Sequence, residues 1–371
     1  MAILGRTQLI PISTGNPGAH QPLASDFPEM VVLCKKDEDG QSVFPNRKEF
    51  YDAGKEGRME MATEPAMTLD DHLTAFLADQ THADQKLKLM AATVISRLTD
   101  RGAFDVPGKP AVEIVVPRKA ATDGNIAAVV LGEHVADRLT RLAPQIEWSV
   151  AYDVVHQAPE NVTKREGARR DPSYRKGKLY MAPDSFFADD RAKYVVAVDD
   201  ATRYGGSFRD LDLFAKQGGK ELLAAAVFEA YETTDLRPTA QNIAKLRKAF
   251  GPEGLAQLDQ SLHAVNLNVS VLTNAEVEFF AEGPIPGLEQ AGSRAEAAIT
   301  YLAEEAANRQ EPMVLRTSDP FVQSVANGET ARVSRRPALA GAKPEIADKS
   351  APKASQRAEG GPAFGGGPVP A

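Results

Sequence analysis

Two neighbouring carboxylates, Asp199 and Asp200, directly follow the apolar run 194–198. A short loop then ends on Gly205 and Gly206, and a segment with helical periodicity begins. Carboxylates bind hydroxyl groups or a hydrated metal ion, whereas loop amides and the N-terminus of a helix hold phosphate. The stretch therefore predicts a site for a ligand that carries both a diol and a phosphate.

Residues 194–207 resemble the signature of the type I phosphoribosyltransferases. That signature consists of an apolar strand, two acidic residues, a short loop rich in Thr and Gly, and a Thr or Ser that opens a helix. In that family the acidic pair contacts the ribose hydroxyls of phosphoribosyl pyrophosphate (PRPP), and the loop grips the phosphate on the ribose. The resemblance implies that Asp199 and Asp200 bind the ribose. The other loop residues that it implies for substrate binding are Ala201, Thr202, Arg203, Tyr204, Gly205, Gly206 and Ser207.

Two large residues, Arg203 and Tyr204, stand where many members of the family have small hydroxyl residues or an Asp that often acts as the base. This departure argues against ordinary purine salvage chemistry. Three functions stay open: a PRPP-dependent phosphoribosyltransferase, a non-catalytic PRPP or nucleotide-binding regulator on the same fold, and a nucleic-acid or partner-binding protein that uses a basic loop. An Asp-Asp pair after a strand also occurs in receiver domains, in nucleotide hydrolases and in turns without chemistry.

The segments around this stretch alternate between strand and helix patterns. Apolar runs predict strands at 112–116, 146–152, 194–198 and 221–228, and helical periodicity predicts helices at 126–139 and 208–217. We therefore expect an α/β fold with an open, mostly parallel sheet and flanking helices, as the resemblance to type I phosphoribosyltransferases over about 110–230 also implies. Ligands of such sheets lie beyond the carboxyl ends of the strands, so Arg118 and Asp199 are expected at one edge.

Two basic segments follow predicted strands at this edge. The loop 117–124 contains Arg118 and Lys119 and ends on a glycine before a helix, which suits a diphosphate. The stretch 164–178 is strongly basic, and in the family a mobile loop at this place closes over PRPP and stabilises departing pyrophosphate. The catalytic residues that the resemblance implies are Arg165, Arg169 and Arg170. It also implies Mg²⁺, bound mainly through PRPP oxygens and water.

The whole chain is expected to comprise four regions. Short strands and helices occupy 1–109, the phosphoribosyltransferase-like core spans 110–275, a helical extension spans 276–331, and a disordered tail spans 332–371. In the family a variable hood from one terminus holds the nucleobase, and either the N-terminal region or the helical addition is a candidate for it here. A strand candidate at 269–272 is expected to join the sheet edge.

Helix starts are marked by a Ser or Thr with an acidic residue three positions later. Ser207 with Asp210 and Ser293 with Glu296 fit this capping pattern. Gly251 is expected to end a helix, because glycine is common just past a helix C-terminus.

Composition bounds the remaining function classes. The chain has 371 residues, of which 43% are hydrophobic and 25% charged, and its net charge of −8 argues against a general nucleic-acid-binding surface. Cys34 is the only cysteine, which excludes an internal disulfide and a cysteine metal cluster. The start lacks the apolar core of a signal peptide, and no run could span a bilayer, so we expect a cytoplasmic protein. Its expected partners are PRPP and a nitrogenous acceptor, with a homodimer as an open alternative to a monomer.

Overall fold

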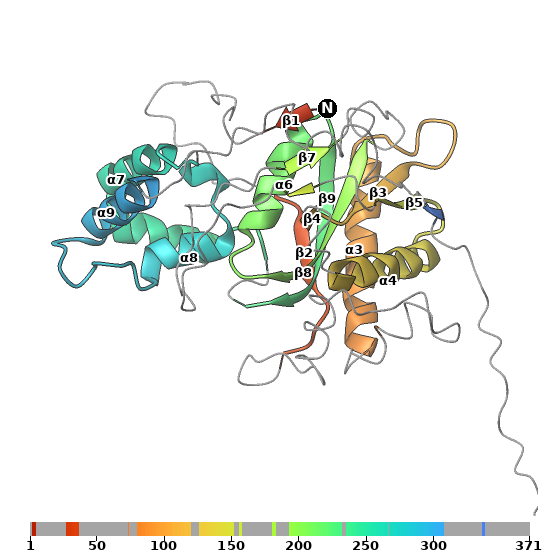
Figure 1. Cartoon of the computed structure of the whole chain (residues 1–371), viewed down its shortest axis with the longest axis horizontal. Coiled ribbons are helices and arrows are strands. Elements are labelled where there is room, and N and C mark those ends of the chain that lie inside the picture. Colours follow the sequence, from red (N-terminus) through yellow and green to blue (C-terminus); the bar gives the residue numbers. More distant parts are fainter. Residues whose placement is uncertain are drawn as a thin grey trace, which may run out of the picture. The chain divides into compact units, whose positions relative to one another are not determined.

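The computed structural model describes residues 2–4, 27–36, 73, 80–119, 126–151, 156–157, 180–182, 193–231, 235–265, 267–307 and 336–337. All of them belong to one unit, Met1–Ala340. Helices cover both faces of a parallel sheet in this part of the chain, which confirms the expected α/β class (Figure 1). No helix within these ranges combines the length and the apolarity that a membrane span requires.

Five parallel strands form the main sheet in the order β5-β3-β8-β9-β2. Their bounds are Glu29–Val32 for β2, Ala111–Val115 for β3, Glu147–Ala151 for β5, Tyr194–Thr202 for β8 and Glu221–Ala230 for β9. A short strand, β10 (Arg336–Pro337), pairs antiparallel with the outer edge of β5. Parallel strands buried on both faces need nearly continuous apolar sequence, and β9 supplies it over 222–228.

Helices α3 (Gln80–Asp100) and α4 (Ile126–Leu142) cover one face of the sheet, and α6 (Gly206–Gln217) covers the other (Figure 1). The alternation of β8 explains how one apolar run serves both layers, because successive side chains of a strand point to opposite faces. Ala197 lies in the core cluster with α6, whereas Val198 lies in the cluster with α3 and α4.

A group of three helices shares the core of α6: α7 (Ala240–His263), α8 (Asn274–Glu282) and α9 (Arg294–Ala307). Between α7 and α8 lies the short 3-10 helix η3 (Val269–Val271), so the strand expected at 269–272 is wrong. Local polar contacts hold this turn. The amide of Val269 donates to the carboxylate of Asp259 at 2.7 Å, and a side-chain acceptor of this kind competes with strand pairing.

Two local signals in this helical group are confirmed. The Ser293 hydroxyl accepts from the amide of Glu296 at 3.1 Å, and the Glu296 carboxylate accepts from the amide of Gly292 at 2.8 Å. The reciprocal bond of this cap therefore reaches one residue further back than the usual capping box. Gly251, with a φ of 62°, interrupts the helical backbone and divides α7 into two helical segments.

A second, smaller sheet has the strand order β1-β7-β6-β4. Its strands are Ala2–Leu4 for β1, Arg118–Lys119 for β4, His156–Gln157 for β6 and Tyr180–Ala182 for β7. β4 pairs parallel with β6, and the other two pairings are antiparallel. Because β4 begins soon after β3 ends, and β6 soon after β5, this sheet starts at the carboxyl ends of the main strands.

Other expectations fall on residues outside the described ranges. Of the region 1–109 in which short strands and helices are expected, Leu73 is described as an isolated residue, and it is helical and buried. The tail expected from residue 332 onward contributes the two residues of β10 to the described part.

Candidate functional site

The carboxyl ends of β3 and β8 form a topological switch point. The two strands are neighbours, with Val115 opposite Ala197. From β3 the chain passes through α4 to β5 on one side, and from β8 it passes through α6 to β9 on the other, with the two helices on opposite faces. In open α/β sheets such a switch point is where the ligand crevice lies. The structure therefore brings the segments that contain Arg118 and Asp199 to adjacent strand ends, as expected.

The acidic pair lies within β8 and not after it, because the strand continues to Thr202 along β9. Asp199 and Asp200 are both half-buried, as is Ala201. Alternation along the strand puts Asp199 on the α6 face and Asp200 on the α4 face. Asp199 Oδ1 accepts from the amide of Asp200 at 2.9 Å, and Asp200 Oδ1 accepts from the amide of Ala201 at 2.9 Å, which orients both carboxylates.

The loop after β8 is a tight turn that ends on Gly205. The buried Thr202 hydroxyl accepts from the amide of Gly205 at 3.1 Å. Gly205 has a φ of 76°, a left-handed conformation that favours glycine, and α6 begins at the next residue. Gly206 and Ser207 form its first turn and are half-buried. The partial positive charge of the helix N-terminus therefore lies directly behind the turn.

The capping box expected from Ser207 and Asp210 is wrong. The N-cap of α6 is Gly205, and no side chain of the described residues caps this helix. Asp210 instead accepts from Nε of Arg209 at 3.1 Å in the buried interior. The physical reason is the short turn, which starts the helix earlier than the hydroxyl pattern predicts.

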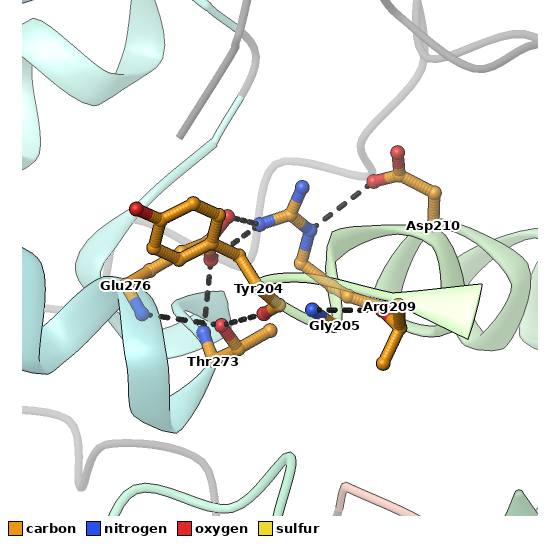
Figure 2. Close-up of polar contacts among 7 residues, drawn as sticks. Tyr204, Gly205, Arg209, Asp210, Thr273 and Glu276 are labelled. Carbon is orange, nitrogen blue, oxygen red and sulfur yellow. Dashed lines mark hydrogen bonds and ion pairs between the residues drawn. The ribbon is translucent and has the colours of Figure 1, made fainter. Parts of the chain in front are cut away.

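A buried polar network joins this turn to the start of α8 (Figure 2). Nη1 of Arg209 donates to both carboxylate oxygens of Glu276, at 2.7 and 2.6 Å. Glu276 Oε2 also accepts from the amide of Thr273 at 2.9 Å, and the Thr273 hydroxyl donates to the carbonyl of Tyr204 at 2.6 Å. Thr273 and Glu276 form the capping box of α8. Their spacing of three residues is the sequence signal that would have found them.

Tyr204 lies against the helical group, and Arg203 lies against the Tyr204 ring. The Tyr204 ring meets the Phe279 ring edge to face, with centroids 6.4 Å apart. The Arg203 guanidinium lies 5.8 Å from the centroid of the Tyr204 ring. Of the two large residues that distinguish this loop from the family pattern, Tyr204 thus contributes a packing contact with α8.

The expected basic residues fall partly outside the described ranges. Arg118 and Lys119 form β4, which pairs with β6. Arg165, Arg169 and Arg170 lie outside the described residues. The segment that contains them is bracketed in the chain by β6 and β7, which pair antiparallel with His156 opposite Met181. The described chain therefore stops before this basic segment at β6, which is next to β4, and resumes after it at β7, on the other side of β6.

A further polar group lies at the carboxyl end of β9, beside the acidic pair. The Tyr231 hydroxyl donates to Oε2 of the buried Glu229 at 2.8 Å, and the Tyr231 amide donates to the carbonyl of Thr202 at 3.0 Å. Nζ of Lys36, which follows β2, donates to the Tyr231 carbonyl at 3.3 Å. Sequence reasoning missed this group, although Glu229 directly follows the apolar run 222–228 and was the available signal.

Within the described residues, no three His, Cys, Asp or Glu side chains form a group that could hold a metal ion. Asp199 and Asp200 offer hard oxygen ligands of the kind that Mg²⁺ takes together with substrate phosphates and water. These residues fit a metal that is held mainly by a bound diphosphate. Neither a protein-family model nor a curated protein matches this chain.

Proposed function

We propose that the protein is a PRPP-dependent phosphoribosyltransferase that moves a ribose 5-phosphate group onto a nitrogenous base or a similar acceptor. One observation carries this proposal: the motif that resembles the PRPP signature lies at the switch point of the parallel sheet. The motif comes from the sequence and the switch point from the strand order, so the two are independent. A parallel sheet binds its ligand at such a point.

The proposed site has a ribose part and a phosphate part. Asp199 and Asp200 accept hydrogen bonds from the ribose hydroxyls. The turn from Thr202 to Gly205 and the N-terminus of α6 bind the phosphate, since backbone amides and the helix dipole favour an anion there. Because the two carboxylates lie on opposite faces of β8, we assign Asp199 to the α6 side of the ribose and Asp200 to the α4 side.

The reaction breaks the bond between the anomeric carbon and pyrophosphate and forms a bond from that carbon to the acceptor nitrogen. The protein's contribution is positioning and charge stabilisation, without a covalent intermediate. Mg²⁺ neutralises charge on the diphosphate when it is bound. Arg118 and Lys119 are proposed to bind the departing diphosphate, and the resemblance assigns Arg165, Arg169 and Arg170 to the stabilisation of its charge.

A non-catalytic PRPP-binding regulator is the second candidate, and the packing of Tyr204 against Phe279 favours it. Neither Arg203 nor Tyr204 is the Asp that often acts as the base at this place in the family. PRPP binding without release of pyrophosphate in the presence of any nucleobase would identify a regulator. Pyrophosphate release with one acceptor would identify the enzyme.

The test is calorimetric titration of PRPP with Mg²⁺ into the wild-type protein and into Asp199→Asn, Asp200→Asn and the double variant. We expect weakened binding in each single variant and no measurable binding in the double variant, with unchanged thermal unfolding. Asp100→Asn is the control, because it also removes one negative charge, but from an exposed residue at the C-terminal end of α3. An unchanged affinity in the folded double variant would exclude this site.

A further inference from the structure

We infer that Thr273, Glu276 and Arg209 are positioning residues that hold the turn from Thr202 to Gly205 in place from the start of α8. The inference deepens the proposed function, on which its ligand rests. None of the three residues is assigned a contact with PRPP. They fix the backbone that binds it.

The first contact is made by the Thr273 side chain, which is 0% exposed. Its hydroxyl donates to the carbonyl of Tyr204 at 2.6 Å and accepts from the amide of Glu276 at 3.3 Å. A hydroxyl has one proton to donate and two lone pairs to accept with, so one side chain caps α8 and binds the turn at once. The bound carbonyl belongs to the residue just before Gly205.

The second contact is the buried pair of Arg209 and Glu276, whose side chains are 2% and 3% exposed. Arg209 lies on the first turns of α6, and Glu276 lies on the first turn of α8. A Cβ atom added to Gly206 would lie 3.3 Å from Arg209 Nη2 and 3.7 Å from Glu276 Oε1. The ion pair therefore lies directly behind the Gly205-Gly206 backbone, and the two helix starts are held together there (Figure 2).

The third contact is apolar and extends into α9. Phe279, whose ring meets Tyr204, also contacts the ring of Tyr301 with centroids 5.8 Å apart. The hydroxyl bond, the ion pair and the aromatic contact all join the turn or the start of α6 to residues about 70 positions later in the chain. In the ion pair, for example, the two residues are 67 positions apart. We therefore infer that α8, with its N-cap Thr273, holds the backbone of the candidate phosphate site.

The experiment compares Thr273→Val with Thr239→Val. Both residues are N-caps in this helical group, and the Thr239 hydroxyl accepts from the amide of Asn242 at 3.1 Å, at the start of α7. The Thr239 amide donates to Oδ1 of Asn274 at 2.9 Å, and a valine at position 239 keeps that backbone bond to α8. Three quantities are measured for each: thermal unfolding, hydrogen exchange of 203–208 in the ligand-free protein, and the Kd for PRPP with Mg²⁺. Thr273→Ser keeps the hydroxyl and serves as the rescue variant.

We expect Thr273→Val to speed exchange of 203–208 and to raise the Kd about tenfold, the effect of losing one buried hydrogen bond. Thr273→Ser should stay within about twofold of wild type, since its hydroxyl makes the same bonds. Thr239→Val should lower thermal stability but change neither exchange of the turn nor the Kd. If Thr273→Val does not fold, Phe279→Leu tests the same idea through the aromatic contact.

Unchanged exchange of 203–208 in a folded Thr273→Val protein would overturn the inference, and so would an equal change in Thr239→Val. A wild-type protein that binds no PRPP would refute the proposed function instead. In that case the exchange measurement, which needs no ligand, still decides whether α8 positions the turn.

Discussion

The conformation of Gly205 allows the candidate phosphate turn to be tested with a single methyl group. Gly205 and Gly219 stand at opposite ends of α6, and both have a φ of 76°. An alanine in this left-handed region costs about 1–2 kcal/mol. The smaller entropy of the unfolded alanine chain offsets about 0.4–1 kcal/mol of that. Each substitution to alanine should therefore lower the free energy of unfolding by about 1 kcal/mol.

The two variants differ in what else they disturb. A Cβ atom on Gly219 would have nothing within 4 Å, so Gly219→Ala reports the backbone cost alone. Gly205→Ala is expected to relax toward negative φ, which weakens the bond of its amide to the Thr202 hydroxyl, 3.1 Å long in the native turn. We expect both variants to lose about 2–4 °C in Tm. Only Gly205→Ala should lose PRPP affinity, by about tenfold, since the turn opens where the phosphate binds.

Denaturant unfolding gives the stability change, and calorimetric titration of PRPP gives the affinity. Both measurements should be made at a temperature at which the two variants are fully folded. If Gly205→Ala is destabilised like Gly219→Ala and still binds PRPP with native affinity, the turn is not the phosphate site. Equal losses of affinity in both variants would point instead to a general loosening of α6.

Two other predictions concern the core around the site. Burial raises the pKa of Asp212 above its ordinary 3.8 despite the bond from Lys216, so the native state binds the proton more tightly than the unfolded state. The stability that this proton contributes is present below pH 3.8 and is lost as pH rises through the raised pKa. Urea unfolding from pH 4 to 7 should therefore show the free energy of unfolding of wild type falling relative to that of Asp212→Asn, and a constant difference would contradict this. Gly132→Ala would place a Cβ 2.5 Å from Cγ2 of Val116 and should destabilise the protein by about 1–3 kcal/mol. The double variant with Val116→Ala should lose less free energy of unfolding than the sum of the two single variants, and strictly additive losses would contradict that contact.

Local sequence patterns predicted the strand and the turn that form the candidate site. The apolar run before Asp199 gave its strand, and the Gly205-Gly206 pair marked the turn, because both signals depend on neighbouring residues. The end of β8 was not predictable locally. Asp has low strand propensity, yet the ladder with β9 carries the strand through Asp199 and Asp200 to Thr202.

The buried network was missed for a different reason. An arginine at position 209 is typical of a surface residue, and its burial depends on ion pairs with Asp210 and with Glu276, the second of which lies 67 residues later. Such a pairing is set by tertiary packing and has no local pattern. The capping box of Thr273 and Glu276 was readable, but its contact with the turn was not.

The pairing of β2 with β9 has a consequence for synthesis of the chain. Nζ of Lys36 bonds to the carbonyl of Tyr231, 195 residues later, and the apolar strand β2 beside it pairs only with β9 among the described strands. At 5–20 residues per second, a ribosome would need roughly 10–40 s to deliver that partner. During this interval an apolar strand is exposed on the nascent polypeptide, which invites aggregation. Lower growth temperatures or added chaperones should therefore improve the yield of folded protein.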